Sequence, residues 1–155
     1  MTSFDDDQQP DLGPLPPAIR QLLQDGMAAH FTDREHAESL FRQAVTLAPE
    51  IPAAHRCLVK HYNRCRQFDK ALAAAKEWVC SAARQAALPD DWRQWQQAPG
   101  PALAALKGLA FIHLRSGQPA AAETAIEQVL ALDPEDGVGG SVIAALVAEM
   151  RLAAI

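Results

Sequence analysis

Apolar residues recur along this chain at intervals typical of packed helices. Two stretches share intervals of four, three and five residues, and each ends in proline. These positions are Ala37, Phe41, Ala44 and Pro49 in the first stretch, and Ala122, Ile126, Val129 and Pro134 in the second. A weaker copy contains Ala71, Ala75 and Trp78, and Ala71 follows Ala37 by 34 residues. Self-similarity at this period predicts an array of helical repeats.

The periodicity and the local start and stop signals together predict seven helices. Thr32 followed by Glu35 forms a capping box that would start the second helix, while Pro49, Pro52 and Pro134 mark helix ends or first turns. The predicted helices span residues 18–30, 33–48, 52–66, 69–87, 102–116, 119–132 and 140–153. Alanine and leucine dominate and β-branched residues are sparse, so the sequence predicts an all-α protein.

These spacings resemble the second half of the tetratricopeptide (TPR) repeat, where a small residue lets two helices cross closely and a proline ends the pair. The first halves match through Leu22, Leu23 and Gly26, then Leu58 and Tyr62, then Leu106, Leu109 and Gly117. The resemblance implies a right-handed α-solenoid of three helix pairs plus a C-terminal capping helix. It implies one domain over 18–155, with repeats at about 18–51, 52–87 and 102–135 and the capping helix at 139–155.

An insertion over 88–101 interrupts the array. Ala71 and Ala122 are 51 residues apart, which is one period plus 17 residues. The extra segment contains Trp92 and Trp95, three residues apart, and Asp90 or Asp91 would cap a short helix that carries them. Tryptophan is enriched at interface hot spots, so the pair is a candidate secondary interface. The alternative is that both rings fold back over the gap between repeats two and three.

The two ends of the chain each leave two interpretations open. Residues 1–17 are rich in Pro, Asp and Gln and predict a disordered tail, whose acidic run over 5–7 would either be solvated or occupy a basic groove in cis. The last helix carries few charges for the end of a solenoid, whose outer face is normally polar. It would either pack across repeat three or form an interface, including one with a second copy.

Composition excludes several classes of protein. The formal net charge of −5 argues against a general nucleic-acid binder, because phosphate contacts need a basic surplus. No signal peptide is recognisable, and no run of apolar residues is long enough to span a membrane. Three cysteines in a chain of 155 residues that can build its own core do not suggest a disulfide framework. We therefore expect a cytoplasmic protein.

In the TPR family the first helix of each repeat lines a concave groove. Carried onto this chain, the resemblance implies a groove lined by Arg56, Lys60, Asn63, Arg64, Lys107, Phe111 and Arg115, with Arg20, Met27, His30 and Phe31 from repeat one. Residues 53–66 contain four of the fourteen basic residues and no acidic residue. The expected ligand is an acidic protein segment or a C-terminal carboxylate, because arginine donates paired hydrogen bonds to carboxylates.

One helical stripe has metal-ligand chemistry. Cys57, His61 and Cys65 lie at i, i+4 and i+8, and thiolate with imidazole suits zinc or iron. Structural zinc sites usually take two ligands from each of two short spacings, which this chain lacks, so cysteine as a buried small hydrophobe is the ordinary interpretation. No phosphate loop, HExxH motif or nucleophile elbow is present. The sequence therefore predicts no cofactor and no catalytic residues.

Together these observations predict a non-catalytic binding module that acts as an adaptor or assembly chaperone. Stand-alone TPR proteins of this size resemble, in format, bacterial secretion chaperones and the accessory factors of metalloenzymes such as nitrogenase. A metal or redox protein that uses the Cys57, His61 and Cys65 stripe, and a homo-oligomer formed through the last helix, are the alternatives.

Overall fold

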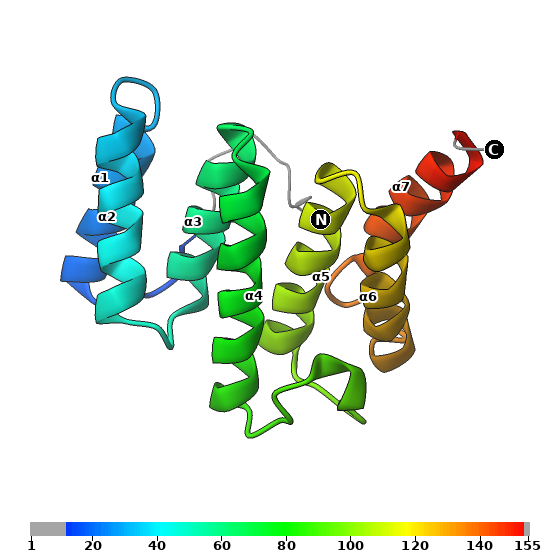
Figure 1. Ribbon diagram of the computed structural model, residues 1–155. Coiled ribbons are helices and arrows are strands. Elements are labelled where there is room, and N and C mark those ends of the chain that lie inside the picture. The colour runs from blue at the N-terminus through cyan, green and yellow to red at the C-terminus, as the bar shows by residue number, and fades with distance from the viewer. Residues whose placement is uncertain (1–11, 154–155) are drawn as a thin grey trace.

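A computed structural model describes residues 12–153 of the chain (Figure 1). The helices are α1 (Pro17–Ala29), α2 (Arg34–Leu47), α3 (Pro52–Arg64), α4 (Phe68–Gln85), the short 3₁₀ helix η1 (Trp92–Gln94), α5 (Gly100–Arg115), α6 (Pro119–Leu132) and α7 (Gly140–Ala153). No strand occurs within the described residues, which confirms the prediction of an all-α protein. The acidic run over 5–7 lies outside these residues.

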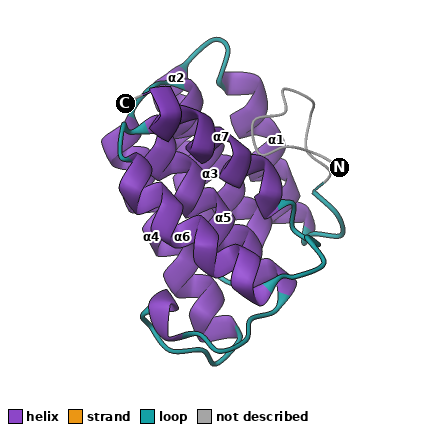
Figure 2. Cartoon of the chain, turned by 90° about the vertical axis from the view of Figure 1, so that its right-hand side faces the viewer, coloured by secondary structure: helices purple, strands orange, loops and turns teal. Residues whose placement is uncertain are grey.

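Each α-helix packs against the next one in the chain, and α1, α3, α5 and α7 also contact one another in series. In Figure 2, which looks along the row of helices, α4 and α6 lie to the left of α1 and α5. The odd-numbered helices therefore form one layer and the even-numbered ones a second. The helices α3 and α5 are far apart in sequence, but this arrangement places them side by side.

The repeated apolar positions form the core between the two layers. Ala37, Ala71 and Ala122 are completely buried, as the small residue of the template requires where helices cross. Gly26 of α1 has a related role, because a Cβ atom there would lie 2.6 Å from Cε1 of the Phe41 ring. The intervals in the sequence therefore identify residues that are buried between the packed helices.

The N-terminal cap of α2 differs from the prediction. Asp33, and not Thr32, is the N-cap, and its carboxylate accepts a hydrogen bond from the His36 backbone N–H at 3.1 Å. The Thr32 hydroxyl instead lies 3.5 Å from the carbonyl of Ala29 in the preceding turn. The predicted capping box is wrong because an aspartate one residue later is an equally good cap and extends the connecting turn.

The insertion folds back onto the helices through Trp95. This side chain is only 2% exposed, and its indole N–H donates to the carbonyl of Pro89 at 2.8 Å. Gln128 of α6 donates to the carbonyls of Trp92 and Trp95 at 3.1 and 3.0 Å. Of the two predicted caps, Asp90 and Asp91, the structure shows Asp91 as the N-cap of η1. Its carboxylate accepts a hydrogen bond from the Arg93 backbone N–H at 3.0 Å. Trp95 is thus part of the core and presents no exposed ring, while Trp92 is half-buried under the Arg93 guanidinium.

Both ends of the described chain pack against the core. Leu12 and Leu15, which the sequence places in the disordered tail, are partly buried against it. At the other end, α7 buries Ile143 and Val147 and holds Gly140 against Val129 of α6. It also leaves four large apolar side chains exposed, namely Val142, Leu146, Met150 and Leu152. The last helix therefore packs against the core with part of its apolar surface and leaves another part exposed.

Candidate functional site

The helices α3 and α5 carry positive charges and no negative ones. They contain five basic residues and no aspartate or glutamate, although the whole protein has a net charge of −5. The basic residues are Arg56, Lys60 and Arg64 on α3, and Lys107 and Arg115 on α5. We call these five the basic face. Because α3 contacts α5 directly, charges that are far apart in sequence act on one surface.

Specific contacts hold α3 and α5 together at this face. The Arg115 Nε donates to Oδ1 of Asn63 at 3.2 Å, and its guanidinium lies 5.4 Å from the centre of the Phe68 ring. The Lys107 Nζ donates to the carbonyl of Val138 at 2.7 Å. Burial lowers the pKa of Lys107, as does the positive charge of Arg56, while Asp136 acts in the opposite direction. Lys107 therefore ties α5 to the loop before α7.

The predicted groove residues differ in how they meet solvent. Arg64 and Arg115 are exposed, whereas Arg56, Lys60 and Lys107 are half-buried. Asn63 and Phe111 are buried, although Phe111 lines a hollow beside Arg115 and α7. The charged residues of the predicted groove are therefore more exposed than Asn63 and Phe111.

The residues predicted for repeat one are spread over both ends of α1. Arg20 donates to the carbonyl of Gly13 and so fixes the segment before the helix. Met27 is partly buried against the core, His30 is half-buried, and Phe31 is 83% exposed. His30 comes close to the basic face, and burial together with the charge of Arg64 lowers its pKa.

The structure divides the predicted stripe of metal ligands. Cys57 is buried in the core, and burial raises the pKa of its thiol to about 11. His61 and Cys65 stay together, with 3.8 Å between His61 Nε2 and Cys65 Sγ, and His30 from α1 joins them at 2.9 Å between the two Nδ1 atoms. One ligand atom from each of these three residues lies within 4.8 Å of the other two. The cluster that can hold a metal is therefore His30, His61 and Cys65.

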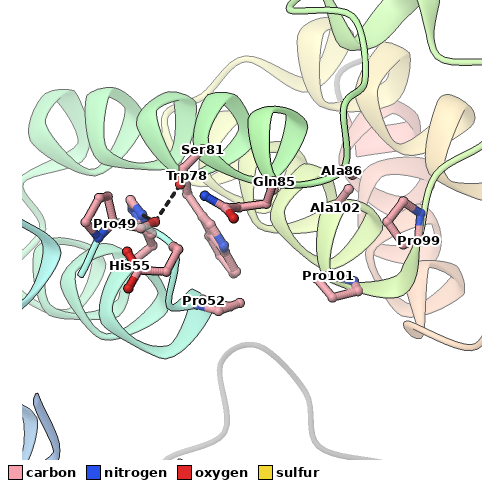
Figure 3. A pocket seen from close by; sticks show the side chains of 12 residues that line it. Pro49, Pro52, His55, Trp78, Ser81, Gln85, Ala86, Pro99, Pro101 and Ala102 are labelled. Atoms are coloured by element: carbon pink, nitrogen blue, oxygen red, sulfur yellow. Dashed lines mark hydrogen bonds between the residues drawn. The ribbon is translucent and has the colours of Figure 1, made fainter. Parts of the chain in front are cut away.

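A pocket of about 260 Å³ that the sequence analysis did not predict opens where α3, α4 and α5 meet (Figure 3). Its rim carries Pro49, Pro52, Pro99 and Pro101, and the Trp78 ring lies inside it. The His55 Nε2 and the Ser81 hydroxyl both hydrogen-bond to the carbonyl of Pro49, at 2.7 and 2.5 Å. Within residues 12–153, the Trp78 indole N–H and the His55 Nδ1 have no hydrogen-bond partner. In the sequence, only the prolines at the starts of α3 and α5 could have indicated this pocket.

The buried His55 makes stability depend on pH. Burial lowers its pKa, more than the hydrogen bond to Pro49 and the Glu77 carboxylate raise it. The contribution is complete above the unfolded histidine pKa of about 6.5 and is lost as the pH falls toward the folded pKa, because the unfolded chain takes up the proton first. We expect the free energy of unfolding to fall less steeply between about pH 7.5 and 5.5 in His55→Gln than in the wild type. Urea titrations at both pH values measure this, and equal slopes would exclude the contribution.

Comparison with known proteins finds no match among protein-family models, curated proteins or solved structures. Among the described residues, no helix combines the length and the apolar character needed to cross a lipid bilayer. The features of the molecule that indicate a function are therefore the basic face, the pocket, and the cluster of His30, His61 and Cys65.

Proposed function

We propose that this protein is a non-catalytic TPR-type binding module that holds an acidic segment of a partner protein against the basic face. The TPR interpretation is supported by the period of 34 residues, by the burial of the template positions and by the series of contacts from α1 through α3 and α5 to α7. A module of this kind serves as an adaptor or assembly chaperone, including as an accessory factor of a multisubunit enzyme.

The absence of acidic residues from α3 and α5 carries the proposal. The helices α2, α4 and α6 hold six acidic residues, namely Glu35, Glu38, Asp69, Glu77, Glu123 and Glu127, while α3 and α5 hold none. Several of these carboxylates are already paired in the second layer, as in Arg42–Glu77 at 2.8 Å and Lys70–Glu38 at 3.3 Å. Neither α3 nor α5 contributes an aspartate or glutamate to the basic face. The sign of its charge favours a ligand that brings carboxylates.

Guanidinium groups determine which anion fits best. Arg64 and Arg115 are exposed at the same end of α3 and α5, near the last turn of each helix. Each guanidinium can bind a carboxylate with two parallel hydrogen bonds. A segment with spaced Asp or Glu residues would satisfy both arginines, whereas a single small anion would satisfy one.

Reversing two charges of the basic face tests this function. We expect Arg64→Glu with Arg115→Glu to weaken the binding of a short Asp/Glu-rich fluorescent peptide at least about tenfold, since each lost contact is worth about 1 kcal/mol and repulsion adds to it. Fluorescence anisotropy at low and at physiological salt measures the change. The matched control is Lys76→Glu with Arg84→Glu, which makes the same change of charge on α4, in the other layer.

The control decides between a site and a general attraction. Weakening in the α3 and α5 variant alone supports the basic face as the binding site. Equal weakening in both variants would mean that the peptide responds only to net charge, and unchanged affinity in both would place binding elsewhere. Circular dichroism shows whether each variant keeps its helices.

A further inference from the structure

Three metal-ligating side chains meet where α1 ends beside the C-terminal turn of α3. His30 is the C-cap of α1, and its backbone N–H still bonds to the carbonyl of Gly26. His61 lies in the last turn of α3, and Cys65 is the C-cap of that helix. The contact between α1 and α3 brings His30 to His61 although 31 residues separate them. The cluster therefore depends on the tertiary fold and is absent from an unfolded chain.

We propose that His30, His61 and Cys65 bind a Zn²⁺ ion, with the fourth coordination position open to solvent or to a ligand from a partner. Two imidazoles with one thiolate match the donor set that zinc takes in proteins. Zinc holds nitrogen at 2.0–2.1 Å and sulfur at about 2.3 Å, which corresponds to about 3.3 Å between two nitrogens and about 3.6 Å between nitrogen and sulfur in a tetrahedral site. The observed separations of 2.9 and 3.8 Å are close to these values.

The two short distances involve opposite nitrogens of the His61 ring. A single ion uses one of these nitrogens, and the third ligand then closes in by a side-chain rotation, since all three ligand atoms already lie within 4.8 Å. The backbone of Arg34 also hydrogen-bonds to the His61 ring. A hydrogen bond to the nitrogen that does not bind the metal fixes the orientation of a ligating histidine.

Charges near the cluster act in both directions on a bound cation. The Cys65 thiol loses its proton to solvent when it binds the ion. The positive charge of Arg34 stabilises a thiolate but opposes a cation, whereas the Glu38 carboxylate favours the cation.

Access to the cluster is sufficient for an ion to enter. His61 is only 3% exposed and lies at the bottom, while His30 and Cys65 are half-buried above it. The ring of Phe31 packs edge-on against His30 at 5.2 Å and is itself largely exposed. The open side of the cluster therefore faces solvent, and an ion bound there would keep one position for water or for a further ligand.

Zinc titration of the full chain tests the site. The experiment is done in a Cys80→Ser background, because Cys80 is an exposed thiol that would bind metal independently. Isothermal titration calorimetry is expected to give one Zn²⁺ per chain. His30→Ala and Cys65→Ser are each expected to weaken this binding at least about a hundredfold. Removing only a group that hydrogen-bonds to a metal ligand already lowers metal affinity about 10–100-fold, and the loss of a ligand itself costs more. His36→Ala, an exposed histidine on α2, is the matched control and should keep the affinity.

Two readouts on the ligands themselves make the result decisive. With Co²⁺ as the probe, a thiolate-to-metal charge-transfer band should appear and be lost in Cys65→Ser. In the wild-type chain, one equivalent of Zn²⁺ should slow alkylation of Cys65 more than that of the exposed Cys80, a measurement that needs no variant. The proposal is overturned if Zn²⁺ fails to protect Cys65, or if His30→Ala and Cys65→Ser bind zinc as well as the control does. Neither result depends on peptide binding at the basic face.

Discussion

Replacing Phe41 with alanine is expected to lower the free energy of unfolding by about 3–5 kcal/mol, the usual cost of truncating a buried phenylalanine. The ring is 3% exposed and fills the space above Gly26, and its centre lies 5.5 Å from that of His61. Its removal leaves a cavity that α1, α2 and α3 share. Urea unfolding followed by circular dichroism measures the loss. Leu47→Ala, at a position 67% exposed on the same helix, is the control and should change stability by less than about 0.5 kcal/mol.

A substitution at Gly26 tests the same packing contact with Phe41. Gly26→Ala gains about 1 kcal/mol of helix propensity but places a methyl group against the ring, and overpacking typically costs 1–3 kcal/mol. If the two residues are in contact as described, Phe41→Leu should reduce the cost of Gly26→Ala, and a double-mutant cycle should show coupling of at least about 0.5 kcal/mol. Additive effects would contradict this contact.

The fold could be predicted well because its packing is repeated. The three template alanines, Ala37, Ala71 and Ala122, follow from the intervals alone, and each is completely buried. All seven predicted helices agree with the structure to within two residues at each end. Gly117 has a φ of 74° in the turn after α5, where a residue with a Cβ atom is disfavoured. Local rules work here because each helix pair meets the same packing problem.

The metal cluster shows where such rules stop. Cys57 and Cys65 are eight residues apart, which places them about 80° apart around a helix, so one can face the core while the other faces the edge. The helical spacing could identify His61 and Cys65 as neighbours, but it could not choose between Cys57 and His30 as the third ligand. His30 reaches His61 from another helix, and only the packing of α1 on α3 brings the two together.

The basic face shows an intermediate case. Its charges could be predicted because a helix without acidic residues is visible in the sequence, whereas the burial of Phe111 could not. Phe111 lies beside α7, and it lines the same hollow as Leu146 and Met150 of that helix. The last helix was predicted to pack across repeat three, and it contacts both α5 and α6, but the sequence does not show which side chains of α5 it covers. Which side chains of α5 remain exposed therefore depends on how the neighbouring helices are placed.

Replacing Trp95 with alanine is expected to lower the free energy of unfolding by about 3–5 kcal/mol, which is large for a residue in a loop. The indole is 2% exposed, and its N–H bonds to the carbonyl of Pro89, so truncation removes buried apolar surface and a hydrogen bond together. The loop that Gln128 holds through two carbonyls then loses its anchor. Urea unfolding measures the change.

Trp92→Ala is the matched control, because it removes the same side chain from a half-buried position in the same loop. Its ring is partly buried against the core and lies 4.4 Å from the Arg93 guanidinium, and a cation–π pair of this kind is worth about 0.5–1 kcal/mol at an exposed site. If Trp95 served a partner surface instead of the core, Trp95→Ala would leave stability unchanged and resemble Trp92→Ala. A large loss at Trp95 alone means that the insertion belongs to the core between α4 and α6, and that only Trp92 is placed to contact a partner.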